Sequence, residues 1–508
     1  MIASSPSLCR WIKPRLLALL AASVALSAAA TPATDATRER DDLRWLARVT
    51  YGADSATLAH LRNVGRERFL DEQLAARDDT LPAPVQAQID AMPITQTPAA
   101  TLLADEIAAQ QRVRALKDGD AASAARRARN EAGNAYARDA MRRHLLRAVY
   151  SPAQLKEQMD WFWLNHFSVF ARKGALRWLV ADYDEHAIRP HALGKFRDLV
   201  LATLTHPAML QYLDNARNAR DHVNENYARE LMELHTLGVD AGYTQRDVQE
   251  LARVLTGVGV ALGDRGARQP GYRSDGLYAF YPARHDFGDK ALLGQTIKGR
   301  GFDEIAQAVD LLVRQPACAR FVSRKLAQYF VADEPPAALV TAMSDTFRRS
   351  DGDIAQVLRT LFASREFAVS LGSSRFKDPM HYVVSSVRLA CDRGTIADER
   401  PLLGWLNGQD EALFGRQSPD GYALAASAWT SSGQLSRRFE IARAIGGNYA
   451  NVLACGDASG ETPRLDGALY AASIQPYLSP ATRDALAQAR SPREWNAMLL
   501  ASPEWNLR

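Results

Sequence analysis

The stretch SPAQLKEQMDWFWLNHF, residues 151–167, predicts a buried helix and indicates the fold class of the chain. Ser151 is a typical N-cap residue, and Pro152 suits the first helical position, where its missing N–H has no intrahelical partner to lose. At helical spacing, one stripe carries Leu155, Met159, Phe162, Trp163 and His166. We therefore expect His166 to face the interior of a helical protein.

Helical patterns continue on both sides of this stretch. Toward the N-terminus, Asp54 and Ser55 cap a helix that we expect to run to about Asn63, with Gly65 as its end. Residues 100–149 predict two long, largely solvated helices, broken once at 117–120. Further helices are expected over 184–215 (interrupted near Pro190), 223–237, 245–256, 303–315, 317–331, 335–349, 353–364 and 378–392, and again in the segment 400–508.

One segment departs from this pattern. Residues 257–301 are rich in glycine and tyrosine, and Leu277–Tyr281 and Ala291–Ile297 alternate like the two strands of a short hairpin. The expected fold class is all-α with a small β-hairpin insertion near 277–297. Because about 475 residues exceed one typical core, we expect several lobes: 42–150, 151–301, 302–395 and 396–508.

The first 30 residues predict export. Basic residues in 1–15 precede an apolar run over 16–26, and Ala28–Ala30 offers a cleavage site for signal peptidase. An uncleaved anchor is the alternative, but the run is short for a membrane span. We expect a signal peptide over 1–30, the general secretory route, a polar linker over 31–41, and no stable membrane span after cleavage. The destination would be the periplasm or the medium.

Charge and cysteine content narrow the functional classes. The chain has 62 basic and 58 acidic residues; without the leader and its three basic residues the balance is 59 to 58, which argues against a nucleic-acid partner. Of the four cysteines, Cys9 falls in the leader. Cys391 and Cys455 could pair in an oxidising compartment, and buried free thiols are the alternative.

Two helical segments carry candidate site residues. His166 is a candidate metal ligand, or else a satisfied core histidine. In 224–235, Glu230 and Glu233 share a polar face with Asn226, which would suit a hard cation or general acid–base work. The alternative is an ion ladder along Glu225, Arg229 and Glu233. His235 is expected on the opposite face of this helix, away from the glutamates unless the helix unwinds.

A third candidate lies in the expected hairpin. The segment RHDFGDK, residues 284–290, places His285 beside Asp286 in one loop. A histidine next to carboxylates suits a metal ligand or a general base, while a turn rich in aspartate and glycine is the alternative. Familiar signatures such as HExxH, G-x-S-x-G and a phosphate-binding loop are absent from the sequence. A Ser/His/Asp triad stays open, but no pattern marks its serine.

Several strings give the chain a family resemblance. WFWLNHFSV (161–169), the segment 224–257, RHDFGDKALLG (284–294), RVTYGAD (48–54), the segment 317–333 and the segment 418–438 resemble the bacterial family called domain of unknown function 1800. The resemblance implies an exported, mainly helical protein and supplies no activity. It also implies a partner from the family called domain of unknown function 1501, which is similar to alkaline phosphatases and sulfatases. The chain departs from the pattern at 415–418 and Ala423.

These observations lead to two functional hypotheses. The first is a metal-dependent periplasmic or secreted enzyme with one composite site, in which a divalent metal is held by His166, His235 and His285. Glu230, Glu233 and Asp286 would be the catalytic carboxylates. The second is a non-catalytic binding or maturation partner of a phosphatase-like or sulfatase-like exported protein.

Overall fold

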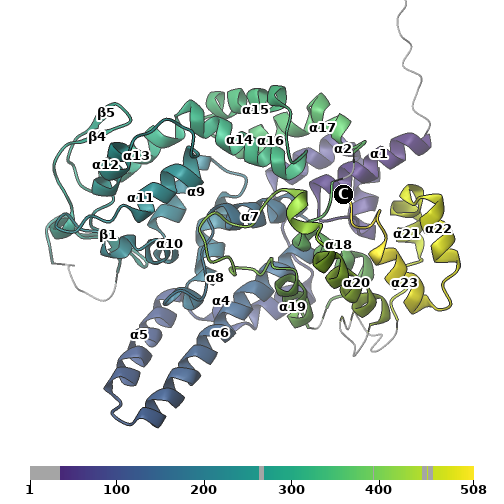
Figure 1. Ribbon diagram of the computed structural model, residues 1–508, viewed down its shortest axis with the longest axis horizontal. Coiled ribbons are helices and arrows are strands. Elements are labelled where there is room, and N and C mark those ends of the chain that lie inside the picture. Colours follow the sequence, from purple (N-terminus) through teal and green to yellow (C-terminus); the bar gives the residue numbers. More distant parts are fainter. Residues whose placement is uncertain are drawn as a thin grey trace, which may run out of the picture.

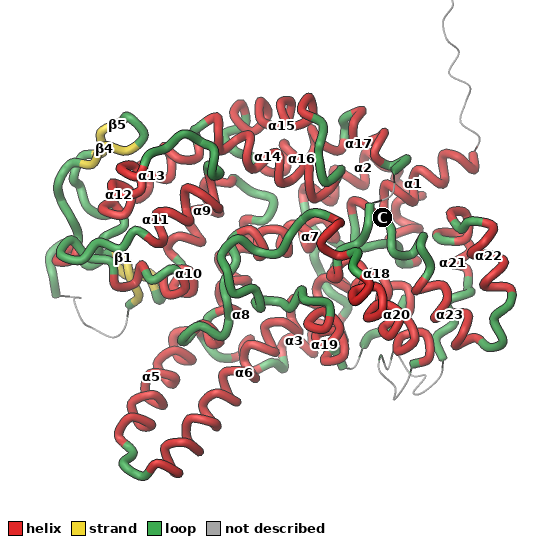
Figure 2. The backbone as a smooth tube through the Cα atoms, in the orientation of Figure 1, coloured by secondary structure: helices red, strands yellow, loops and turns green. Residues whose placement is uncertain are grey.

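The computed structural model of the protein describes residues 35–261, 268–373, 375–392, 394–396, 398–448, 453, 455 and 462–508. Over these residues it is 63% helical, with twenty-three α-helices and short strands in two small sheets (Figure 2). The predicted all-α class is confirmed. The predicted leader, residues 1–30, lies outside the described residues, and the lobe boundaries stay a prediction.

The N-terminal helices end in a projecting arm. The elements are α1 (Asp35–Val49), α2 (Ser55–Ala75), α3 (Ala83–Asp90), α4 (Pro93–Gln96), α5 (Ala99–Ala115) and α6 (Gly119–Tyr150). Asp54 caps α2 as predicted, and Gly65, at a φ of 79°, kinks this helix. Helices α5 and α6 pack on each other and extend away from the body, with the predicted break between them at their tip (Figure 1).

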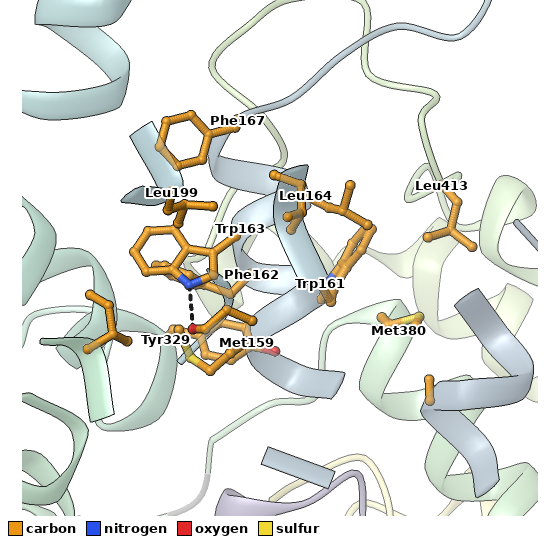
Figure 3. Close-up of a cluster of buried hydrophobic side chains, with 14 of the residues drawn as sticks. Met159, Trp161, Phe162, Trp163, Leu164, Phe167, Leu199, Tyr329, Met380 and Leu413 are labelled. Atoms are coloured by element: carbon orange, nitrogen blue, oxygen red, sulfur yellow. Dashed lines mark hydrogen bonds between the residues drawn. The ribbon is translucent and has the colours of Figure 1, made fainter. Parts of the chain in front are cut away.

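Helix α7 (Gln154–His166) runs through the middle of the molecule. Its side chains are buried on all sides, so it is a core helix rather than a surface amphipathic one. Figure 3 shows Trp163 and Phe167 on the side of Leu199, and Trp161 on the side of Met380 and Leu413. The indole N–H of Trp163 donates to the carbonyl of Ala192 at 2.9 Å.

The predicted start of this helix is wrong by about two residues. Ser151 is not an N-cap; instead it ends α6, and its backbone N–H donates to the carbonyl of Arg147 at 2.9 Å. The side-chain amide of Gln154 then donates to the carbonyls of Ala148 and Ser151, at 3.0 and 2.8 Å. Helix α7 begins only at Gln154 because these bonds close a tight turn between two helices.

The chain after α7 is a series of short helical segments. They are η1 (Leu176–Trp178), α8 (Val180–Asp182), the π-helix η2 (Tyr183–Ile188), η3 (Arg189–His191), α9 (Phe196–Thr205), α10 (Pro207–Tyr212), η4 (Asn215–Arg217), α11 (Asn226–Glu230), the π-helix η5 (Leu231–Thr236) and α12 (Gln245–Val254). A Thr244–Asp247 capping box begins α12, with both reciprocal bonds present, and supports the helix expected from residue 245.

The β insertion differs from the predicted hairpin. Strand β3 (Tyr278–Phe280) pairs with β1 (Val258–Val260) and β2 (Arg273–Asp275), whereas β4 (Lys290–Leu292) pairs with β5 (Gln295–Ile297). The two predicted strands therefore belong to separate antiparallel sheets, with η6 (Pro282–Arg284) between them. The reason is local: Leu293 and Gly294 both have positive φ and close a two-residue hairpin within 290–297.

The second half of the chain is helical. It contains α13 (Asp303–Val313), α14 (Pro316–Phe330), α15 (Ala337–Arg349), α16 (Ile354–Phe362), α17 (Arg365–Ser370), α18 (Pro379–Ala390), α19 (Arg400–Gly408), η7 (Ala426–Trp429), α20 (Ser432–Gly447), α21 (Ala468–Ser473), η9 (Gln475–Tyr477), α22 (Pro480–Ala487) and α23 (Pro492–Ala501). Consecutive helices α14, α15 and α16 pack on one another, and α20 packs against α23.

The core is continuous across these helices. Buried apolar side chains form one cluster that reaches from Leu43 in α1 to Leu500 in α23. Cys391 and Cys455 form a disulfide with a Cα–Cα distance of 5.4 Å, and Cys318 is buried and unpaired. Among the described residues, no helix has both the length and the hydrophobicity needed to cross a membrane.

Candidate functional site

The structure brings two of the predicted metal ligands together. His166, at the end of α7, donates from Nε2 to the carbonyl of His235 at 2.9 Å, and its Nδ1 accepts from Lys325 of α14 at 2.9 Å. Both ring nitrogens of His166 are thus occupied. His235 is fully buried, and neither of its ring nitrogens has a hydrogen-bond partner among the described residues.

Several ionisable groups around this histidine pair have pKa values shifted from their ordinary ones. Burial, then the charge of Lys325, lowers the pKa of His235 to about 3, so the ring is neutral at neutral pH. Burial also lowers the pKa of Lys325 to about 8, while Asp420 opposes that shift. For Glu230 the pKa is raised, first by burial and then by Glu233, with a smaller contribution from Asp420.

The two predicted glutamates lie at the end of α11 and in the π-helix η5, which also carries His235. Glu230 and Glu233 are both half-buried. Arg229 bonds Glu225 at 3.1 Å, so the first step of the predicted ion ladder is present. Glu230, with a raised pKa, and Lys325, with a lowered one, both feel the charge of Asp420.

A loop from the C-terminal part completes this region. Asn165 of α7 accepts from the backbone N–H of Tyr422 at 2.6 Å and donates to the Tyr422 carbonyl at 3.0 Å. Gly421, at a φ of 75°, is required here because a Cβ on it would lie 2.2 Å from the carbonyl oxygen of Asn165. Asp420 is thereby fixed near Lys325 and Glu230. Sequence patterns gave no sign that this loop would contribute.

His285 and Asp286 belong to a different network. The His285 ring bonds the carbonyl of Thr256 through Nδ1 at 2.7 Å and a carboxylate oxygen of Glu304 through Nε2 at 3.1 Å. Lys290 also bonds Glu304, and the three side chains are fully buried. Asp286 pairs with Arg253 at 2.8 Å. These bonds fasten the β insertion to α12 and α13.

The predicted ligands His166, His235 and His285 are not gathered around one point. Both nitrogens of His166 and of His285 are engaged elsewhere, in the two networks described above. Within the described ranges, a group of three ligand atoms mutually within 4.8 Å occurs only at His144, Asp160 and Asp184. The roles assigned from sequence to the six candidate residues stay predictions.

A cavity of about 190 Å³ lies elsewhere, between the N-terminal and C-terminal helices. Its wall is mostly apolar and includes Leu43, Leu371, Leu389, Ile474 and Trp505. A few polar groups converge on it, namely Arg44, Lys377, His381, Ser385 and Arg508. An apolar cavity with a small number of converging polar groups is the usual form of a small-molecule site.

Backbone pairing places Lys377 at this cavity. The N–H of Lys377 donates to the carbonyl of Asn506 at 2.8 Å, and Phe376 forms a β-bridge with Leu507. Asp378 then caps α18, and its carboxylate accepts from the backbone N–H of His381 at 2.7 Å. The lysine therefore precedes a helix whose inner face carries Ser385.

Lys377 and Ser385 form a hydrogen-bonded pair. The Lys377 Nζ donates to the Ser385 Oγ at 3.0 Å, and the Oγ in turn donates to the carbonyl of Tyr382 at 3.2 Å. Burial, followed by the charges of Arg438 and Arg508, lowers the pKa of Lys377 well below its usual value. The carboxylate of Asp378 opposes this shift, but burial and the two arginines outweigh it, so the neutral amine is the favoured form.

Arg508 supplies the positive charge on the wall of the cavity. It donates to the carbonyl of Tyr329 at 2.9 Å, while its Nε–H is buried without a partner among the described residues. Gly52 approaches Ser385 from the other side: a Cβ on Gly52 would lie 3.1 Å from the Ser385 Cβ, and its φ is 102°. Ser385 therefore contacts Lys377 and Gly52, and it lines the cavity together with Arg508.

The sequence gave little sign of this pair. Lys377 and Ser385 are separated by a helix start, and neither falls in a familiar motif. The available signal was the segment FKDPMHYVVSSVRLA, in which one lysine directly precedes the capped, apolar helix that carries two serines.

Fold and site together define an all-helical protein with one continuous core and two regions of perturbed titratable groups. A family model described as "Protein of unknown function (DUF1800)" matches residues 44–507, nearly the whole chain. The chain belongs to this family, as the resemblance indicated. No curated protein and no solved structure gives a significant match.

Proposed function

We propose that this protein is an exported hydrolase in which Ser385 is the nucleophile and Lys377 the general base. The observation that carries this proposal is the 3.0 Å hydrogen bond between the Lys377 Nζ and the Ser385 Oγ at the wall of the cavity. Serine–lysine pairs act in acyl transfer when the lysine is held neutral by its surroundings. The surroundings of Lys377 have this effect.

The chemistry follows from these groups. The Ser385 O–H turns from the Tyr382 carbonyl to the neutral Lys377 amine, which takes its proton while the Oγ attacks the carbonyl carbon of an ester or amide. Negative charge on the carbonyl oxygen is stabilised by the Arg508 N–H. The protonated lysine then gives its proton to the leaving group, and an acyl-serine remains. Water, deprotonated by Lys377, attacks the acyl carbon and releases a carboxylic acid and the free serine.

The wall of the cavity suggests the class of substrate. This wall is mostly apolar and includes leucine, isoleucine and tryptophan side chains, which suits an apolar acyl group. Arg44 and Arg508 add positive charge, whereas the carboxylate of Glu504 is engaged by Ser479 and Thr482. A small ester or amide with an apolar acyl part is the substrate class that we propose.

Export is part of the proposal. It is supported by the sequence pattern of residues 1–30 and by the Cys391–Cys455 disulfide, because disulfides persist chiefly in oxidising compartments. N-terminal sequencing of protein recovered from the periplasm or the medium should begin near Thr31. Cytoplasmic protein that retains Met1 would contradict export.

A fluorophosphonate probe tests the nucleophile without knowledge of the substrate. We expect wild-type protein to be labelled at Ser385, identified by mass spectrometry, and the Ser385→Ala and Lys377→Met variants to lose labelling at least about 100-fold, the usual scale of a lost acid–base partner. The adjacent Ser386→Ala is the matched control, since Ser386 accepts from the Trp505 indole at 2.9 Å and should leave labelling in place. Equal labelling of wild type and S385A contradicts the proposal.

A second candidate function keeps the composite site predicted from sequence. The two unpartnered nitrogens of buried His235, close to the charge of Lys325, and the raised pKa of Glu230 favour an acid–base or divalent-metal enzyme at that place. Glu230→Gln should then abolish an activity that S385A leaves intact, with Glu225→Gln as the control. If neither site supports activity, the proposed alternative is a non-catalytic partner of a phosphatase-like protein of the domain of unknown function 1501 family, which co-purification of the two proteins would test.

A further inference from the structure

Three buried side chains of types that bind metals, His144, Asp160 and Asp184, lie close together where α6, α7 and η2 pack. None of them belongs to the two regions described above. His144 comes from α6, Asp160 from α7 and Asp184 from the π-helix η2. The His144 Nδ1 lies 3.3 Å from the Asp184 Oδ2 and 3.7 Å from the Asp160 Oδ2. Ligand atoms that share one ion at about 2.0–2.2 Å lie roughly 3–4 Å apart, so both spacings fit a shared cation.

Only part of this group is satisfied by protein partners. Each of the three side chains is only 1% exposed, and the His144 Nδ1 and the Asp184 Oδ2 hydrogen-bond each other. The Asp160 Oδ1, the Asp184 Oδ1 and the His144 Nε2 have no hydrogen-bond partner among the described residues. An unpaired buried polar atom costs about 1–3 kcal/mol, and more when it is charged. The two carboxylate oxygens are available to a cation bound between the facing atoms, whereas the His144 Nε2, on the other side of the ring from Nδ1, is not part of that shell.

Neighbouring cations do not complete the group. Arg189 makes a two-pronged pair with Glu157, at 2.6 and 2.7 Å, and approaches the Asp160 Oδ2 only to 3.5 Å. Arg143 and Arg147 both pair with Glu185. The two adjacent carboxylates, Asp160 and Asp184, therefore each keep one oxygen without a protein partner among the described residues.

We infer that His144, Asp160 and Asp184 bind one divalent cation, Zn²⁺ or Mn²⁺. One imidazole and two carboxylates are ligands for either ion. The ion would be structural, because the three side chains are closed off from solvent. It would join α6, the long helix of the arm, to α7 and η2. The π-helical turn at Tyr183–Ile188 agrees with this, since such turns are frequent at functional sites.

Metal analysis of the untagged full-length chain tests the inference. Protein stripped with a chelator is dialysed against ZnCl₂ or, separately, MnCl₂, and bound metal is measured by inductively coupled plasma mass spectrometry. We expect about one tightly held equivalent of one of these ions and a higher Tm than that of the stripped protein. His144→Gln and Asp160→Asn should lose both effects. Asp182→Asn is the control, because Asp182 pairs with His186 and His206 outside this group.

Two outcomes overturn the inference. One is wild-type protein that takes up neither ion and shows no change in Tm. The other is a His144→Gln variant that keeps the full equivalent. Should the variants fail to fold, zinc-edge or manganese-edge X-ray absorption of the wild type decides, since the inference requires a shell of nitrogen and oxygen ligands with one imidazole. A sulfur shell, or a shell without imidazole, contradicts it.

Discussion

At the scale of single residues, two buried bases, Lys377 and His235, lie close to like charges. Lys377 lies near Arg438 and Arg508, and His235 lies near Lys325. Both environments favour the neutral form of a base. For a lysine, neutrality creates a proton acceptor. For a histidine, it leaves two polar nitrogens in the core that only a ligand or a rearrangement would satisfy.

The pH dependence of Ser385 labelling tests the neutral lysine. Lys377 accepts a proton only in its amine form, so the rate of fluorophosphonate labelling should rise with pH through the lowered pKa of Lys377 and then level off well below pH 10.5. Labelling rates measured from pH 5 to pH 10 give the curve. A rate that is still climbing steeply at pH 10 would mean that Lys377 titrates like an ordinary surface lysine.

His235 should make the protein sensitive to acid. Its pKa is about 3 in the folded protein, against about 6.5 when unfolded, so between these values the unfolded chain binds more protons. Stability should therefore fall as pH drops below 6.5, by an amount on the order of a few kcal/mol. His235→Leu should flatten this part of the curve of unfolding free energy against pH. Urea titrations at pH 7 and pH 4.5 measure it; an unchanged slope would show that other groups dominate.

From the sequence, the burial of a single side chain could be predicted where the period of its own helix determines which way it points. His166 is buried, as the helical period indicated, whereas the π-helical turn at Leu231–Thr236 departs from the period used to place His235. The partners were beyond reach because they come from distant segments: Lys325 lies 159 residues after His166. Likewise, Lys377 reaches Ser385 only because residues 375–377 pair with 506–508.

At the scale of elements, the contact between Asn165 and the loop at 420–422 leaves no room for a side chain at position 421. Gly421→Ala would place a Cβ 2.2 Å from a backbone oxygen at a φ of 75°, so we expect a loss of at least about 2 kcal/mol in unfolding free energy. Gly433→Ala, in α20 with no atom closer than 4.0 Å to the added Cβ, should be neutral or slightly stabilising. Urea unfolding of both variants makes the comparison. Equal stabilities would mean that the loop yields freely.

The extent of most helices was predictable from caps and periodicity. The expected 303–315, 317–331 and 353–364 correspond to α13, α14 and α16 within three residues at each end. The errors arose where a tertiary bond replaced the local signal. Ser151 resembles an N-cap, but α6 uses its N–H first. Two alternating stretches resemble one hairpin, but the tight turn at Leu293 and Gly294 gives the second stretch its own partner.

At the scale of the whole molecule, the Cys391–Cys455 disulfide closes a long covalent loop. Because the two cysteines are 64 positions apart, removal of the disulfide should cost about 4 kcal/mol if the loss is mainly loop entropy. Cys455→Ser should therefore lower the Tm by several degrees, and dithiothreitol should do the same to the wild type. Cys318→Ser is a poor control because that thiol is buried, so the doubly substituted C391S/C455S variant serves instead. A Tm indifferent to dithiothreitol would show that the loop is held by packing alone.

The tip of the arm formed by α5 and α6 is a place at which the chain can be cut into two fragments. This tip, residues 116–118, is exposed and carries Lys117, a site for trypsin. A single cut there would separate a fragment with α1 to α5 from one with α6 to α23. Contacts of α2 with α7 and α16, and of α3 and α4 with α6, would hold the two pieces together without a covalent link. The same tip would accept an inserted reporter, or serve as the seam for assembling the protein from two separately produced halves.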